Sequence, residues 1–385
     1  MKILYIAACA YPGDSAYATR IEGLCDVLNK AGHETFILVD YSKDSVGRRR
    51  YRESLVISSA KHIYAERSLS DKVLAYSRMI YNLKKIVKEN HFDCVIISSI
   101  YMRANAILNI LRKKRIPVIL ESCEWFDTYN WKKGEKSYEY KKFLKAWNDI
   151  FPHVDGVVAI SRMLEQHYLE SVQHVLRIPT VMEVKQHPYR TEVSDNAVKL
   201  IFTGSIAWGK DRLLELIKAI NTINDSRLQL DVYGPSKDEV VSQLGEDKYL
   251  LEKLTDTVRI HGRIDHELVE KKCMESDFGV IIRPERRQSD AGFPTKLAEY
   301  MTVGTPVIAN DTGDIGLYVK NGYNGFCLPR SIKDSDLVDV LKYILTLSID
   351  ERMMLRKNAR SMAEKSFDCA CYVDELNKMV YKVTS

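Results

Sequence analysis

The chain has 385 residues, of which 45% are hydrophobic and 28% are charged, and its formal net charge is +5. This length is about twice that at which single hydrophobic cores divide, so two domains are expected. Ordinary Gly and Pro usage excludes collagen-like and largely disordered chains, and apolar runs well below roughly 18 residues predict that the chain does not span a membrane.

The N-terminal segment is the first predicted element. Lys2 followed by the small and apolar residues 3–11 resembles a secretory leader in composition, but the apolar part before Cys9 spans only residues 3–6. Because a signal-peptide core needs more, we interpret the segment as a buried first strand of a cytoplasmic protein. The eight cysteines are scattered, mostly in apolar segments that favour buried thiols. The isolated pair Cys369 and Cys371 does not have the pattern of a zinc site.

Short β-rich runs alternate with amphipathic helical stretches along the chain, which is typical of parallel sheets covered by helices. In the first half the predicted strands are 3–8, 35–39, 55–58, 94–98, 118–120 and 156–160, and the predicted helices are 19–31, 70–89, 102–113, 137–150 and 161–170. In the second half the predicted strands are 199–203, 229–233, 258–261, 278–282, 307–309 and 325–328, and the predicted helices are 211–223, 265–274, 295–303, 334–347 and segments of 350–383.

The predicted fold class is therefore α/β, with two Rossmann-like domains facing a central cleft. Ligands of such sheets bind beyond the carboxyl ends of the strands. We assign 1–185 to the first domain, 186–365 to the second, and 366–385 to a C-terminal helix that packs back towards the first domain.

Positive charge is concentrated in the first half. Residues 1–190 contain 30 Lys and Arg against 21 Asp and Glu, whereas the remainder contains 27 against 31. The basic residues cluster at 48–52, 84–85, 112–115 and 132–142. These clusters fit solvated helix faces and loops, or a face that meets anionic lipid. Nucleic acid is not expected, because no nucleic-acid-binding motif accompanies the charge.

The first turn of each domain is a candidate anion site. Gly13 lies in the turn before the first helix, where the backbone can approach a ligand. Gly204 ends the first strand of the second domain, and Lys210 is predicted to open the next helix, near an anion bound there or simply in solvent. Neither turn has a dinucleotide or P-loop motif.

The segment 283–310 carries the most information. Pro294 is predicted to be the first residue of a helix, so the free amides of Thr295, Lys296 and Leu297 would bind an anion. Glu299, one turn further on, either accepts hydrogen bonds from the hydroxyls of the same ligand or is an ordinary surface glutamate.

A resemblance becomes visible when the motifs are taken together. The second half resembles the donor-binding domain of the retaining GT-B glycosyltransferases of family 4, and the first half carries two steps of the same family, in order. The matching stretches are 200–204 with Lys210, 231–234, 258–262 and 293–307 in the second half, and 32–34 and 155–161 in the first.

The resemblance implies a nucleotide-sugar donor, with Glu299 on the ribose. Gly204, Lys210 and the helix amides would hold the diphosphate, with no metal and no cofactor, and Lys210 is also a catalytic candidate. Where relatives have a sugar-binding glutamate this chain has Ala291, so Asp290 or Glu285 would take over, or backbone amides would hold the sugar alone. Where relatives often have an arginine it has Ser205, which leaves phosphate charge to Lys210 and to Arg283, Arg286 or Lys296. Further substrate-binding candidates are Gly13, Ser205 and Arg263.

In the first domain Glu124 is the candidate catalytic carboxylate. It follows the strand at 118–120, near the position of a histidine or aspartate in many relatives, and is otherwise a structural residue bonded to loop amides. The aromatic residues of 125–131 would stack on a sugar or lipid, or pack in the core.

We therefore expect a cytoplasmic glycosyltransferase, peripheral to the membrane, that acts on a glycan or polyprenyl-linked acceptor in surface-polysaccharide assembly. A small soluble acceptor and a non-catalytic GT-B partner protein remain alternatives.

Overall fold

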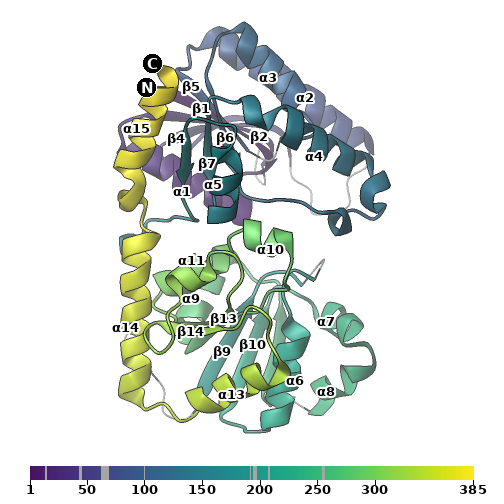
Figure 1. Cartoon of the computed structure of the whole chain (residues 1–385), viewed down its shortest axis with the longest axis vertical. Helices are drawn as coiled ribbons and strands as arrows, with labels where there is room; N and C mark the ends of the chain where they lie inside the picture. The colour runs from purple at the N-terminus through teal and green to yellow at the C-terminus, as the bar shows by residue number, and fades with distance from the viewer. Residues whose placement is uncertain are drawn as a thin grey trace. The chain divides into compact units, whose positions relative to one another are not determined.

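A computed structural model describes residues 1–13, 15–42, 46–61, 69–98, 100–190, 192–193, 197–206, 209–253 and 256–385. The chain forms two compact units, each built on one sheet (Figure 1). Unit 1 comprises Met1–Glu183 and Cys369–Ser385, and unit 2 comprises Val184–Asp368.

The sheet of unit 1 has eight strands in the order β3-β4-β2-β1-β5-β6-β7-β8. All neighbouring pairs are parallel except β3 and β4, which form an antiparallel hairpin at one edge. The strands are β1 Lys2–Ala10, β2 Glu34–Ser42, β3 Gly47–Tyr51, β4 Ser54–Lys61, β5 Cys94–Ser98, β6 Val118–Ser122, β7 Gly156–Ala159 and β8 Val175–Arg177. The central strand β5 is buried at every position, because helices cover both faces of a parallel sheet.

The helices of unit 1 connect these strands and cover the sheet. They are α1 Ala16–Lys30, α2 Leu69–Glu89, α3 Ala104–Lys113, α4 Tyr138–Asp149, α5 Arg162–Leu169 and α15 Val373–Thr384. Short 3₁₀ turns lie at Thr128–Asn130, Gly134–Lys136, Phe151–His153 and Cys369–Tyr372. Ser15 caps α1, since its hydroxyl accepts from the Ala18 N–H at 3.2 Å.

The C-terminal helix α15 completes the core of unit 1, beside β7 and β8 (Figure 1). Leu376, Met379 and Val380 are buried there with residues of α1 and β1. A polar contact also connects α15 to the N-terminal part of the chain: the His33 ring nitrogen Nε2 lies 2.9 Å from the Asn377 side-chain oxygen.

Unit 2 has a six-stranded sheet, parallel throughout, in the order β11-β10-β9-β12-β13-β14. The strands are β9 Val198–Thr203, β10 Leu228–Tyr233, β11 Val258–Gly262, β12 Phe278–Ile281, β13 Val307–Asn310 and β14 Gly325–Leu328. The helices are α6 Leu213–Ile223, α7 Lys237–Leu244, α8 Tyr249–Lys253, α9 His266–Glu275, α10 Arg287–Ala291, α11 Thr295–Thr302, α12 Ile315–Tyr318, α13 Asp334–Ile344 and α14 Ile349–Ser366. Further 3₁₀ turns are Val184–Gln186 and Gly245–Lys248.

Helix α14 fixes the position of α11 in unit 2, and Figure 1 shows it along the flank of this unit. The buried Arg360 guanidinium of α14 donates to the Thr302 carbonyl at the C-terminal end of α11 and, at 3.0 Å, to the His187 carbonyl. A cation at this end of a helix is favourable because the helix dipole is negative there.

The predicted α/β class with two Rossmann-like domains is confirmed, and each predicted strand is present. The prediction omits two edge strands of unit 1. β3 contains three successive arginines, whose alternate side chains Arg48 and Arg50 face solvent at the sheet edge, and β8 is only three residues long. Among the described residues, no helix is long and apolar enough to span a membrane.

Candidate functional site

Two glycines shape the carboxyl ends of β9 and β10. Gly204 follows β9 with φ +113°, and its N–H donates to the Tyr233 carbonyl at 3.0 Å. Gly234 follows β10 with φ +120°, and a Cβ atom there would lie 2.1 Å from the Gly204 carbonyl oxygen. Only glycine allows both the dihedral angle and this approach. The turn leaves Gly204 and Ser205 exposed beyond the strand end.

The Lys296 side chain reaches this turn from α11. A Cβ atom on Gly204 would lie 3.6 Å from the Lys296 ammonium nitrogen. The ammonium donates to the Asp211 carboxylate at 2.8 Å and lies 4.4 Å from the centroid of the Phe202 ring. Both charged side chains are largely buried, with 13% and 8% of their surfaces exposed. A positive charge is therefore held in place at the end of β9.

The N-terminus of α11 lies at the same strand end because its Tyr300 is bonded to β9. The Tyr300 hydroxyl accepts from the Thr203 N–H at 2.9 Å and lies 2.8 Å from the Thr203 hydroxyl. Its ring occupies the space over Gly279, where a Cβ atom would come within 2.2 Å of it. Tyr300 is not among the residues predicted for the site, although it follows Glu299 directly and is turned by about 100° onto the buried side of the helix.

The helix amides differ from the prediction at one position. Pro294 is the cap rather than the first helical residue, and the Leu297 N–H donates to the Pro294 carbonyl at 2.8 Å, so it is not free for an anion. The predicted role of Leu297 is corrected for this reason. Within the described part of the chain, the N–H groups of Thr295 and Lys296 have no hydrogen-bond partner. Two amides remain to form an anion site at a helix N-terminus.

Glu299 lies one turn along α11 from Thr295 and is half-buried. Its position four residues after Thr295 places both side chains on one face of the helix. Helix α11 packs against α9, which contains Cys273. Burial raises the pKa of the Cys273 thiol well above its ordinary value, and the negative charges of Glu299 and Glu270 raise it further. Glu299 and the free amides are separated by one helical turn, and this separation suits a ligand with an anionic part and a hydroxyl-bearing part.

Lys210 does not open a helix. The expected helix 211–223 begins at Leu213, because the Arg212 N–H donates to the Ile282 carbonyl after β12, at 2.7 Å, and Arg212 has non-helical dihedral angles. Lys210 is therefore an exposed loop residue. A Cβ atom on the neighbouring Gly209 would lie 3.6 Å from the Arg286 guanidinium, so Arg286 approaches the same loop.

Arg283 and Asp290 make contacts within the protein. The Arg283 guanidinium donates to the Ser289 carbonyl at 2.9 Å. Both oxygens of Asp290 accept from Arg330, at 2.6 and 2.5 Å, and one of them also accepts from the Gly313 N–H at 3.0 Å. Ala291 beside it is fully buried. The arrangement ties α10 to the end of β14, while the predicted contact of Asp290 with a sugar stays a prediction.

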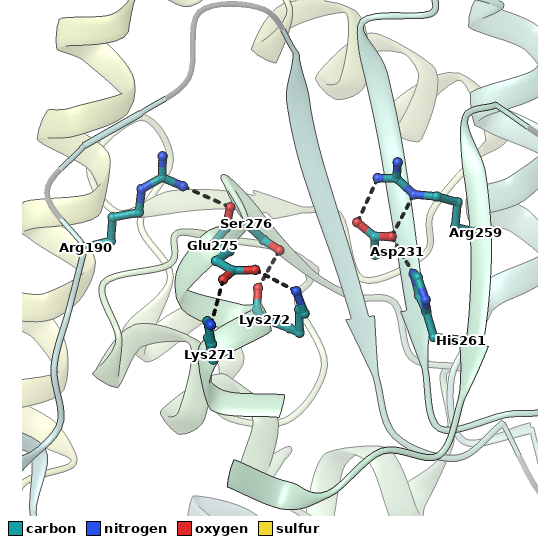
Figure 2. Close-up of polar contacts among 8 residues, drawn as sticks. All are labelled: Arg190, Asp231, Arg259, His261, Lys271, Lys272, Glu275 and Ser276. Atoms are coloured by element: carbon teal, nitrogen blue, oxygen red, sulfur yellow. Dashed lines mark hydrogen bonds and ion pairs between the residues drawn. The ribbon is translucent and has the colours of Figure 1, made fainter. Parts of the chain in front are cut away.

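Figure 2 shows a polar cluster that the sequence analysis does not recognise, on strands β10 and β11. Asp231 accepts from Arg259 at 2.9 and 3.0 Å and lies 2.6 Å from the His261 Nε2. The His261 ring stacks on Tyr233 at 4.5 Å. Burial alone would raise the pKa of Asp231, but the hydrogen bonds from Arg259 and His261 hold it below its usual value. The cluster fixes the edge of the sheet just before Gly262 and the exposed Arg263.

A second group in Figure 2, separate from the first, consists of residues of α9 and its C-terminal end with Arg190. Glu275 accepts from Lys272 at 2.8 Å and lies 4.0 Å from Lys271. Its backbone carbonyl accepts from Arg190 at 3.1 Å. These contacts connect α9 to the chain that enters unit 2.

In unit 1, Glu124 lies two residues beyond β6 and is half-buried. Burial, with the charges of Glu139 and Glu124, raises the pKa of Tyr101 to about 12, which places this carboxylate near that phenol. Gly13 lies in the turn after β1, where a Cβ atom would come within 3.2 Å of the Ala10 carbonyl oxygen. Asp14 lies outside the described residues.

A buried ion pair that was not predicted lies at the carboxyl ends of β5 and β6. Arg20 donates to Glu121 at 2.9 Å, and both side chains are almost fully buried. Glu121 also accepts from the Ser98 hydroxyl, and Arg20 donates to the Pro179 carbonyl. A charged residue inside the apolar run 118–122 is the signal that could have identified Glu121.

The aromatic residues after Glu124 pack largely on protein. The Trp125 ring lies 4.7 Å from both Trp147 and His167. Phe126 and Trp131 contact each other at 5.6 Å. Trp125, Phe126 and Trp131 are all half-buried, so packing on protein covers part of their surface and their predicted stacking on a sugar or lipid stays a prediction.

Comparisons with known proteins agree with this geometry. The family model of the glycosyl transferases group 1 matches residues 186–362, and that of Glycosyltransferase Family 4 matches residues 18–180. No curated protein matches the chain by sequence.

Solved structures show the same fold along almost the whole chain. Sucrose-phosphate synthase from Thermosynechococcus elongatus has a TM-score of 0.75 at 15% identity, covering 99% of this chain and 98% of that chain. HepE from Anabaena in complex with UDP has a TM-score of 0.69 at 12% identity, covering 99% and 100%. A glycosyltransferase from Rickettsia africae has a TM-score of 0.65 at 17% identity, covering 99% and 98%. With the two family models matched one after the other on both units, the chain belongs to the GT-B glycosyltransferases of the family 4 type.

Proposed function

We propose that this protein is a retaining, metal-independent glycosyltransferase that moves a sugar from a nucleotide diphosphate sugar, preferably a UDP-sugar, to a glycan or lipid-linked acceptor. The observation that carries the proposal is the anion site of unit 2. There the Lys296 ammonium, the free amides of Thr295 and Lys296, and the Gly204 turn lie at the end of one strand. The structures of Anabaena HepE with UDP and with UDP-glucose support the choice of donor.

The donor would lie with its diphosphate at Gly204 and the α11 amides and its ribose at Glu299. Fixed positive charges and amide dipoles stabilise the negative charge that develops on the leaving diphosphate, and they need no reorganisation during the reaction. Lys296 supplies a held charge, and Lys210 and Arg286 supply further charge from the loop before α6. With these groups neutralising the leaving group, the reaction requires no metal.

The acceptor would bind to unit 1, where Glu124 orients its hydroxyl or favours the positive charge that develops on the sugar. The excess of basic residues in 1–190 suits an acceptor carried on a polyprenyl lipid in the cytoplasmic face of an anionic membrane. We therefore place the protein in surface-polysaccharide assembly. A small soluble acceptor is the alternative, and absence of vesicle binding would favour it.

A second candidate, a non-catalytic GT-B partner protein, rests on Ala291 and Asp290. The position at which family resemblance implies a sugar-binding glutamate is a buried alanine. The neighbouring carboxylate is already bonded to Arg330 through both oxygens. Such a protein would bind no nucleotide.

Thermal unfolding in the presence of UDP, GDP, ADP and CMP tests the proposal. A nucleotide at about 100 times its dissociation constant stabilises the folded state by about 2.7 kcal/mol, which raises the melting temperature. Glu299→Ala should weaken the binding of that nucleotide by about 1 to 3 kcal/mol, or roughly 5- to 150-fold, since a carboxylate that accepts from ribose is lost.

Glu246→Ala is the matched control, because Glu246 is an exposed carboxylate of unit 2 on a different turn. It should bind the nucleotide as the wild type does. Unchanged affinity in Glu299→Ala would remove Glu299 from the site, and no stabilisation by any nucleotide would favour the non-catalytic candidate. The anomeric configuration of the transfer product then tests retention.

A further inference from the structure

Unit 1 contains a cavity of about 370 Å³ that the proposed function does not use. It lies between α2 and the β3–β4 hairpin, at the edge of the sheet. Its volume is within the range of small-molecule sites. The polar groups of its lining are Arg48, Arg78, Lys85, Ser58, Ser59 and Asn82.

The cavity has the charge of an anion site. Three of its lining residues are cations and none is a carboxylate. Glu89 pairs with Arg48 at 2.5 Å and lies 3.9 Å from Lys85, outside the lining. The Asn82 amide donates to the Ser59 hydroxyl at 3.3 Å, which sets neutral donors beside the cations. Guanidinium, ammonium, hydroxyl and amide groups together are the partners that a phosphate oxygen binds.

The rim of the cavity is apolar and open to solvent. Tyr81 and Val46 line it and are 64% and 54% exposed. On α2, Leu74 stands four residues before Arg78 and seven before Tyr81, so these side chains follow one face of the helix. Leu74 is 48% exposed. A helix face that mixes exposed apolar and aromatic residues with basic ones is typical of a helix that lies at a membrane surface.

We propose that this cavity binds the phosphate of an anionic phospholipid at a membrane surface. The lipid phosphate contacts Arg78, Lys85 and Arg48, while Tyr81 and Leu74 enter the headgroup region. A free phosphate would leave these apolar side chains in water, which is why a membrane lipid is the preferred occupant. The inference goes beyond the proposed function, with which it shares only the membrane setting, because the donor site lies in unit 2.

Vesicle co-sedimentation with a matched pair of variants tests the inference. Arg78→Ala/Lys85→Ala removes two cavity cations, and Lys84→Ala/Lys88→Ala removes the same charge from the same helix outside the lining. Vesicles contain equal parts of phosphatidylcholine and phosphatidylglycerol, or phosphatidylcholine alone. A surface potential acts alike on any basic residue near it. We therefore expect the cavity variant to bind about tenfold more weakly than the control variant, the effect of one charge-assisted hydrogen bond.

Two further arms separate the sources of phosphate and the possible failures. Tyr81→Ser keeps the charge and should weaken vesicle binding severalfold without changing any affinity for glycerol phosphate. Equal loss in both double variants, or no wild-type binding to the anionic vesicles, would overturn the inference. Binding of glycerol phosphate without vesicle binding would overturn the lipid assignment. Tryptophan fluorescence shows that unit 1 of a variant is folded, because this unit contains Trp125, Trp131 and Trp147. UDP-dependent stabilisation, measured on the same samples, reports separately on the proposed function.

Discussion

Each unit has a cation paired with a carboxylate at the carboxyl ends of its strands, and the two pairs are built differently. In unit 1, Arg20 and Glu121 are 2.9 Å apart with side chains 2% and 0% exposed, and both have further partners. In unit 2, Lys296 and Asp211 are 2.8 Å apart with side chains 13% and 8% exposed. Among the described residues, Asp211 is the single hydrogen-bond partner of the Lys296 ammonium.

The difference separates a structural pair from a ligand-binding one. An ammonium has three donors, so Lys296 retains donors for an incoming anion at a partly exposed site. Arg20 also retains a donor, since its Nη2 has no partner among the described residues, but its side chain is enclosed by protein. Open amides of Thr295 and Lys296 accompany the Lys296–Asp211 pair. The ion pair at the carboxyl ends of the strands therefore serves stability in unit 1, whereas in our proposal the corresponding pair serves donor binding in unit 2.

The largest effect is expected for Arg20→Ala. It leaves the buried Glu121 charge without its partner, so the free energy of unfolding of unit 1 should fall by about 3 to 5 kcal/mol. Urea unfolding followed by tryptophan fluorescence measures this, because Trp125, Trp131 and Trp147 belong to unit 1. The double variant Arg20→Met/Glu121→Leu should recover most of the loss. A decrease of less than about 1 kcal/mol in Arg20→Ala would contradict the structural role.

The second effect concerns ligand binding in unit 2. Lys296→Met removes the held charge and should weaken binding of a nucleoside diphosphate by about 1.5 to 3 kcal/mol, roughly 10- to 150-fold. Asp211→Asn removes the competing carboxylate and should leave binding unchanged or tighten it severalfold. Isothermal titration calorimetry distinguishes the two. If both variants weaken binding equally, the pair is structural, as in unit 1.

The smallest effect is expected for the Asp231 cluster. Since the pKa of Asp231 is lowered in the folded state, its contribution to stability is present above the unfolded pKa of about 3.9 and is lost as pH falls through the folded value. Asp231→Asn should reduce the free energy of unfolding of unit 2 by about 1 to 2 kcal/mol at pH 7. Urea unfolding at a series of pH values should show variant and wild type converging below the folded pKa. A constant difference at all pH values would exclude this linkage.

The sequence predicts strands such as β12 and β13 of unit 2 well because they are buried at every position. A strand such as Phe278–Ile281, covered on both faces, has to be apolar throughout, and its neighbours share this pattern. The same logic misses β3, since an antiparallel edge strand can expose every second arginine. The hydrophobic pattern also places the start of α6 too early. The hydrogen bond from Arg212 to Ile282 connects residues that are far apart in the chain, so a local pattern does not contain it.

The sequence predicts only those parts of the site whose residues are close together in the chain. The α11 amides and Glu299 follow from one short motif, apart from Leu297, whose amide is occupied. The approach of Lys296 to Gly204 depends on the packing of α11 against β9 through Tyr300, and no spacing in the chain contains it. Glu121 and Arg20 are 101 residues apart, which conceals their pairing in the same way.

The return of the chain to unit 1 at Cys369 has a consequence for biosynthesis. Unit 2 is contiguous in sequence and can fold once Asp368 has left the ribosome, whereas unit 1 must wait for the residues that form α15. Until then the groove that receives Leu376, Met379 and Val380 stays uncovered, and so does Gly156, over which the Met379 methyl packs. The first residues to be translated are thus the last to reach their native environment, and a chain truncated before residue 369 would combine a complete unit 2 with an incomplete unit 1.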